Sequence, residues 1–288
     1  MRSLIATIQR LPLSLKRQRV LPGLVGGLAI TLPILFLFAV LPITAMVLYA
    51  LRLDSAEILA ALSDKRLQSA LWLSFSSSLI GAIVATPIGL LIAWALSRYT
   101  FPGRSVIDAL IDVPFALPTA VTGIALAYLY GPHGFLGKWF NSVGIQIAYT
   151  RAGIVLALIF VSLPFVVRTL QPVIEALQRD REEAASTLGA NDLQTFIRVV
   201  VPQLKTALAT GFALSFARGV GEYGSVIFIA GNRPFSTEVA PLLIITKLEE
   251  VKYADAFVIA SAMLFFSVLT LIVLTMVQRS KAAEATHG

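Results

Sequence analysis

Arg218 and Glu222 interrupt an otherwise apolar stretch of the chain. Their four-residue spacing would place both on one face of a helix. Charges inside a membrane segment usually face a bundle interior or a water-filled path. The sequence therefore predicts either a structural ion pair that fixes helix packing or a charged position on a translocation path, and these roles are compatible. Gly221 lies between them and leaves room for another helix or a hydrated ion.

Asp108 and Asp112 form a second pair with the same spacing. Two carboxylates on one helix face could form an intramembrane aspartyl site. A partner contact near Arg98 or Arg104 is the favoured interpretation.

The sequence predicts no catalytic residue, cofactor or metal site in this chain. Gly219, Gly221 and Gly224 spell G-x-G-x-x-G, but a dinucleotide site also requires a preceding strand in a βαβ unit. No Walker-type phosphate loop, G-x-S-x-G or H-E-x-x-H pattern occurs. The chain has no Cys and two His residues far apart. We expect a protein that is not itself an enzyme.

Composition indicates a multi-pass all-α membrane protein. The 288 residues are 57% hydrophobic and 14% charged, whereas soluble domains carry about 25% charge. Mean hydropathy is +0.83. The net charge of +7 could suggest a nucleic-acid partner, but basic cytoplasmic loops in contact with membrane lipid explain it more simply.

Six apolar segments are each long enough to cross a bilayer. If the N-terminus is cytoplasmic, fourteen Lys and Arg residues fall inside and eight outside, which predicts that both termini are cytoplasmic. We expect an N-terminal arm over 1–23, a permease domain over 24–279 and a tail over 280–288. The expected spans are 24–51, 68–96, 106–130, 152–170, 206–229 and 256–277.

Two irregular stretches accompany these spans. Pro118, Thr119 and Thr122 crowd the third span, so this part is expected to face a cavity rather than lipid. Residues 239–245 are apolar but too short to span, which suggests an interfacial or re-entrant helix. The surrounding loop, 231–255, is either a docking surface for a solute-binding protein or a solvated loop.

One polar interruption, at about 175–204, separates the fourth and fifth spans. Its chemistry predicts a helix, a turn and a second helix. Pro172 suits a first helical turn, and Gly189 suits the position after a helix end, where φ is often positive. Asn191 is expected to be an N-cap, with Gln194 completing a capping box.

The same interruption resembles the EAA loop of the inner-membrane subunits of bacterial ATP-binding cassette importers. Val199 and Val201 stand where Ile and Leu are usual. In that family the loop is a coupling helix that docks on a cytoplasmic ATPase. A membrane scaffold or an ATP-independent carrier would leave the spacing unexplained. The residues that match the pattern are Glu183, Ala184, Ala185, Gly189 and Pro202.

Further motifs are similar to the T-type permease family of sulfate/thiosulfate importers. The resemblance implies a type I (MetI-like) permease with alternating access in a bacterial inner membrane. Its implied partners are a W-type permease, two ATPase subunits that bind ATP, and a periplasmic sulfate-binding protein. Molybdate or tungstate permeases share several features and remain the alternative, since the residues alone support only an anion-compatible path through Arg218. The matching stretches are 117–123, 130–132, 218–224, 230–232 and 237–242.

Overall fold

The computed structural model describes residues 24–284, and these are helical with no strand. They divide into two compact units at Arg52. The first unit contains α2 (Leu24–Leu35), a π-helical turn η2 (Phe36–Val40) and α3 (Leu41–Leu51), which follow one another without a loop. Its described side chains are mostly exposed and apolar, as expected of a lipid-facing helix. The expected arm over 1–23 lies outside the described residues.

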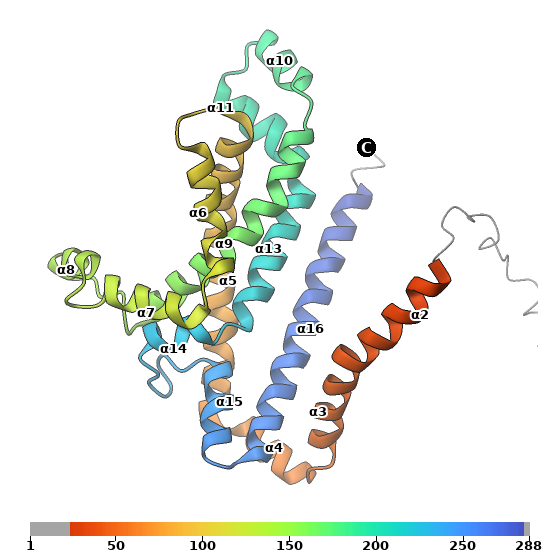
Figure 1. The fold of residues 1–288 in the computed structure, drawn as a ribbon, viewed down its shortest axis with the longest axis vertical. Helices are drawn as coiled ribbons and strands as arrows, with labels where there is room; N and C mark the ends of the chain where they lie inside the picture. Colours follow the sequence, from red (N-terminus) through yellow and green to blue (C-terminus); the bar gives the residue numbers. More distant parts are fainter. Residues whose placement is uncertain (1–23, 285–288) are drawn as a thin grey trace, which may run out of the picture. The chain divides into compact units, whose positions relative to one another are not determined.

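Three long helices form the centre of the second unit: α5 (Lys65–Arg98), α9 (Arg151–Ala176) and α13 (Lys205–Val220). They lie side by side in Figure 1. Glycines permit the close packing: a Cβ on Gly89 of α5 would lie 2.6 Å from Cγ1 of Val166 in α9, and one on Gly211 of α13 would lie 3.4 Å from the Val166 Cα. Small residues at helix contacts are typical of membrane bundles.

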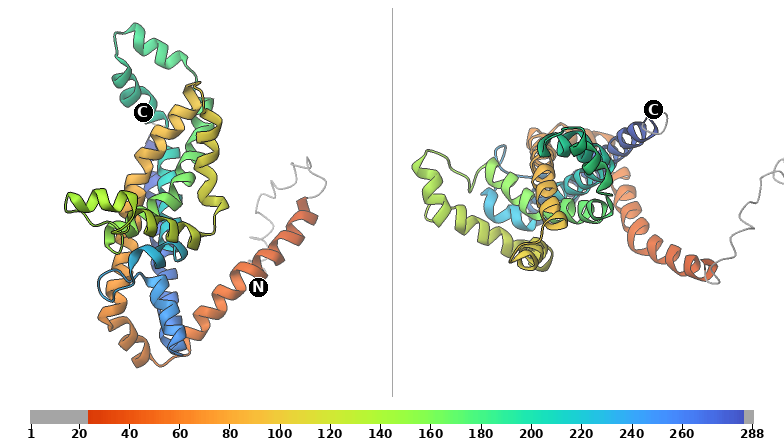
Figure 2. Two further views of the ribbon diagram at one scale, coloured as in Figure 1. Left: turned by 60° about the vertical axis from the view of Figure 1, so that its left-hand side comes forward. Right: turned by 90° about the horizontal axis from the view of Figure 1, so that it is seen from above.

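The shorter elements lie around this centre. Figures 1 and 2 place α10 and α11 at one end of the second unit, α4 and α15 at the other, and α8 to one side. The remaining elements are α4 (Ser55–Ser63), α6 (Arg104–Ala116), α7 (Thr119–Tyr130), α8 (Phe135–Ser142), α10 (Asp180–Thr187), α11 (Asp192–Thr195), η3 (Phe196–Val200), α12 (Val201–Gln203), α14 (Gly224–Ala230), α15 (Ala240–Glu249) and α16 (Tyr253–Glu284).

By length and composition, four helical segments could cross a membrane, and up to six if each of two bent pairs is one span. The four are Gly26–Tyr49, Lys65–Arg98, Arg151–Ala176 and Tyr253–Val273. The bent pairs are Arg104–Ala116 with Thr119–Tyr130, at 113°, and Asp192–Gln203 with Lys205–Val220, at 72°.

Two predicted spans are therefore not continuous helices. The expected span 106–130 breaks at Leu117, because Pro118 disfavours the α conformation in the residue before it. The expected span 206–229 ends at Val220, and a separate helix, α14, starts at Gly224. α16 continues to Glu284, past the end expected at residue 279.

The prediction that Pro172 begins a helix is also wrong. Pro172 lies inside α9, which runs on to Ala176. A proline removes one backbone hydrogen bond from a helix interior. Here the adjoining turns are held by packing, since Leu170 and Ile174 are fully buried against α5 and the 200–204 region.

Candidate functional site

The 175–204 segment contains the predicted helix–turn–helix. α10 has acidic residues in its first turn, where the helix dipole favours them. At its other end Gly189 has φ 85°, which confirms the predicted positive value. Its N–H donates to Ser186 O at 3.0 Å, and the Ala190 N–H donates to Ala185 O at 3.1 Å. This is the Schellman pattern that glycine favours after a helix.

The second half of the segment begins with the predicted capping box. The Gln194 N–H donates to Asn191 Oδ1 at 2.9 Å, and the Asn191 N–H donates to Gln194 Oε1 at 3.1 Å. The chain then enters the π-helical turn η3, in which the Val201 N–H bonds to Phe196 O, five residues back. Pro202 follows within the short α12.

This segment presents apolar side chains to its surroundings. Leu188, in the turn, is 88% exposed, and Leu193 and Ile197 are also exposed. Glu183 and Ala184 are exposed on α10, while Ala185 is half-buried. Apolar side chains gathered on a polar segment at the end of a bundle are typical of a protein contact surface.

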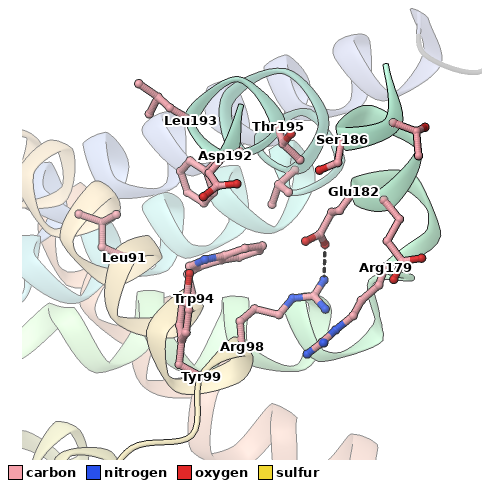
Figure 3. Close-up of a pocket in the computed structure, with 14 residues that line it drawn as sticks. Leu91, Trp94, Arg98, Tyr99, Arg179, Glu182, Ser186, Asp192, Leu193 and Thr195 are labelled. Atoms are coloured by element: carbon pink, nitrogen blue, oxygen red, sulfur yellow. Dashed lines mark hydrogen bonds and ion pairs between the residues drawn. The ribbon is translucent and has the colours of Figure 1, made fainter. Parts of the chain in front are cut away.

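A cavity of about 850 Å³ lies between this segment and the end of α5 (Figure 3). Arg98, the last residue of α5, donates from Nη2 to Glu182 Oε1 at 2.6 Å and to Leu177 O at 3.3 Å. Its guanidinium also lies 5.2 Å from the ring centroid of Trp94. The sequence did not predict this cavity. Its lining comprises Leu91, Trp94, Arg98, Tyr99, Arg179, Glu182, Glu183, Ser186, Thr187, Asp192, Leu193, Thr195, Phe196 and Val200.

Arg218 and Glu222 form an ion pair of 2.6 Å. They do not share a helix, because α13 ends at Val220. The Glu222 side chain is 2% exposed, and its Oε1 accepts hydrogen bonds of 2.9 Å from both the N–H and the hydroxyl of Ser225. Glu222 thus closes the break and binds the first turn of α14. The structural half of the prediction is confirmed, although the shared helix face is wrong.

The two breaks lie against each other. A Cβ on Gly224 would lie 3.1 Å from the Thr119 Cβ, and one on Gly123 would lie 2.7 Å from the Ser225 Cα. Thr119 therefore lies beside the second break. Gly221 faces open space, with no atom within 4 Å of its Cβ position.

The predicted cavity-facing stretch in the third span is divided. Pro118 is exposed, Thr119 is half-buried, and Thr122 is buried at 3% exposure. Within this chain Thr122 is thus a packing residue at the start of α7. Its burial follows from the close approach of α7 and α14.

Asp108 and Asp112 contact neither Arg98 nor Arg104 through a hydrogen bond or ion pair in the described structure. Both pair instead with Arg168 of α9, each at 2.6 Å. Arg168 Nε donates to Asp112 at 2.9 Å, and other guanidinium hydrogens reach Gln171 Oε1 and Asp108 O. The guanidinium has no unused donor. The expected site was wrong because the packing of α6 on α9 determines which cation is near.

The opposite end of the unit is held by further polar contacts. Arg66 makes a bidentate bond with the buried Glu238, at 2.7 and 2.6 Å. Arg233 Nη2 donates to Tyr149 O at 2.8 Å. The expected short helix over 239–245 is present as α15. These contacts fix the 231–239 loop against α5 and the start of α9.

Apolar helices of spanning length, with charges paired between them, define an integral membrane protein with several spans. The model of the family "Binding-protein-dependent transport system inner membrane component" matches residues 85–282. The chain belongs to this family, and the resemblance seen in the 175–204 segment is confirmed at that level.

Curated relatives agree with this assignment. The "Probable sulfate transport system permease protein cysT" of Nephroselmis olivacea is 45% identical over 252 residues, 88% of this chain and 89% of the relative. The "Sulfate transport system permease protein CysT" of Escherichia coli (strain K12) is 45% identical over 254 residues, 88% of this chain and 92% of the relative.

Solved structures share the fold at low sequence identity. A bacterial ABC transporter involved in the import of alginate has a TM-score of 0.71 at 13% identity, covering 91% of this chain and 95% of that chain. An amino acid ABC transporter with histidines has a TM-score of 0.56 at 18% identity, covering 79% of this chain and 99% of that chain.

Proposed function

We propose that this chain is the permease subunit of an ATP-driven importer of sulfate and thiosulfate. The observation that carries the proposal is 45% identity, over about nine tenths of both chains, to relatives named as sulfate transport permeases. Arg218 adds a cation compatible with an anionic substrate, although its pairing with Glu222 neutralises it in this conformation. Molybdate or tungstate is the alternative substrate.

The proposed topology has six spans in a bacterial inner membrane and both termini in the cytoplasm. The two bent pairs each count as one span, which is compatible with lengths and composition. The permease domain corresponds to 24–279, with the 175–204 segment in the cytoplasm. The excess of Lys and Arg in the loops on that side supports this orientation.

The proposed partners bind at opposite ends of the second unit. Two ATPase subunits, which bind the ATP, contact the exposed apolar side chains of the 175–204 segment in this chain and its counterpart in a W-type permease. A periplasmic sulfate-binding protein docks at the end that carries the 231–239 loop. Its polar contacts support a preformed docking surface, because an ordered loop loses less entropy on binding.

The proposed mechanism is alternating access. ATP closes the ATPase dimer and moves α10 through Glu183, Ala184 and Ala185, with the turn at Gly189 and the joint at Pro202 keeping the segment in shape. The spans then rock and open the path outward, and hydrolysis reverses the movement. Around Arg218 the break at Gly221 provides open space in which an anion could approach the guanidinium.

Uptake of radiolabelled sulfate by cells that lack this chain tests the proposal. Unlabelled sulfate, thiosulfate and molybdate serve as competitors. We expect uptake to be lost in the deletion strain and restored by the cloned chain, with sulfate and thiosulfate competing. Unchanged sulfate uptake, or competition by molybdate alone, would refute the sulfate assignment and leave family membership intact.

A further inference from the structure

Arg98 is the point at which three elements of the second unit meet. It ends α5, it bonds the carbonyl of Leu177 at the end of α9, and it forms an ion pair with Glu182 of α10. In Figure 3 its guanidinium points from α5 directly toward Glu182, beside Trp94. No other residue type has a planar group with donors in the fixed fork that such a junction uses.

The burial of this junction makes the contact rigid. The Arg98 side chain is 10% exposed and the Glu182 side chain 24% exposed. A charge-assisted hydrogen bond that is shielded from water is stronger than the same bond at the surface. Because Arg98 also contacts Leu177 and Trp94, its side chain has little freedom to follow Glu182 without moving α5.

The chain path gives this junction its significance. The 175–204 segment is covalently joined to α9 on one side and α13 on the other, but not to α5. At 34 residues α5 is about 51 Å long, which exceeds the roughly 30 Å apolar thickness of a bilayer. Its last turns therefore extend beyond the apolar layer and reach α10. Besides Arg98, the ring of Trp94 contacts Phe196 of η3, with centroids 5.2 Å apart.

We propose that Arg98 is a positioning residue that, through Glu182, makes α5 move together with α10. This inference rests on the proposed function, since it concerns how movement of the 175–204 segment reaches the membrane. ATPase movement would then act on α5, α9 and α13 together. Without the Arg98–Glu182 contact, α10 would turn against the end of α5, and hydrolysis would proceed with less transport.

Distance measurement tests the rigid connection directly. This chain has no cysteine, so spin labels can be attached to Leu91→Cys on α5 and Thr187→Cys on α10, in a complex whose other subunits are cysteine-free. We expect the same narrow distance distribution in the nucleotide-free and ATP-bound complex. With Arg98→Gln added, the distribution should broaden or shift when ATP binds. An Arg98→Gln complex that matches the unsubstituted one would overturn the proposal.

A double-substitution cycle tests the consequence for transport. Sulfate transported per ATP hydrolysed is measured in proteoliposomes for Arg98→Gln, Glu182→Gln and the double variant. We expect each single change to lower this ratio by roughly 2- to 30-fold, and the double variant to be no worse than either, because both changes remove one contact. Additive losses would show that the two residues act separately and would contradict the proposal.

Lys205→Gln is the matched control. Lys205 is an exposed cation at the same end of the unit and has no ion pair in the described part of the chain. Its replacement should leave the ratio unchanged. The spin-label measurement needs no sulfate, so it remains informative if the substrate assignment fails. Absence of sulfate uptake by the unsubstituted complex would instead refute the proposed function.

Discussion

Replacement of Gly123 by alanine should break the contact between the two helical breaks. Gly123 lies on α7, and a Cβ at this position would be 2.7 Å from the Ser225 Cα. Ordinary van der Waals contact begins at 3.4 Å, so α7 and α14 would have to separate by about 0.7 Å. The obstacle is backbone, which cannot rotate away as a long side chain could.

The magnitude follows from this geometry. Overpacking a well-packed site usually costs about 1–3 kcal/mol. Because backbone must move, we expect Gly123→Ala to lower the free energy of unfolding by about 2–3 kcal/mol, which is a factor of about 30 to 140 in the equilibrium constant. Gly221→Ala is the control: Gly221 has φ −89° and no atom within 4 Å of its Cβ position. Alanine there should change stability by less than about 1 kcal/mol.

The assay is thermal unfolding of the purified protein in detergent, followed by the amount that remains monodisperse after heating. Gly123→Ala should show a clearly lower midpoint than the unsubstituted protein, while Gly221→Ala should stay close to it. Equal midpoints for the two variants would refute the reasoning. That result would mean that α7 and α14 are not packed together as described.

Three further changes test other parts of the structure. Gly189→Leu forces a side chain into a left-handed conformation at a cost of about 1–2 kcal/mol, so sulfate transported per ATP should fall while Gly189→Asn, which tolerates this conformation, preserves it; equal ratios would refute a role for the turn. Glu238→Gln removes one charge of a pair whose Arg66 side is 24% exposed, so we expect a loss of about 1–2 kcal/mol, and an unchanged unfolding midpoint would contradict it. Arg218→Ala should impair sulfate uptake without loss of assembly, since Glu222 keeps its bonds to Ser225; normal uptake would leave Arg218 with a packing role alone.

The regular parts of the fold follow from the sequence because they depend on local properties. Apolar length alone located α5, α9 and α16 to within a few residues at most of their ends. Gly189 and Asn191 predicted their turn correctly, since a positive φ and an N-cap are set by the residue itself and its near neighbours. Hydropathy carries no directional information, so it did not indicate that the chain bends at Pro118.

Contacts between distant residues could not be predicted in the same way. Asp108 lies close in sequence to Arg104, yet its partner is Arg168, sixty residues away. Arg98 and Glu182 are likewise far apart in the chain. Which cation meets which carboxylate depends on how helices are packed, and spacing along one helix restricts only the pairs within it.

The π-helical turn η3 has a consequence for how the length of this segment can vary between related chains. A π turn holds one more residue than the α-helical turn it replaces. Deleting one residue between Phe196 and Val200 would restore an α turn, but it would rotate everything before it by about 100° relative to α13. Gly189 and the exposed Leu188 would then face another direction. Insertions and deletions should therefore be excluded between Gly189 and Pro202, even though much of that stretch is exposed.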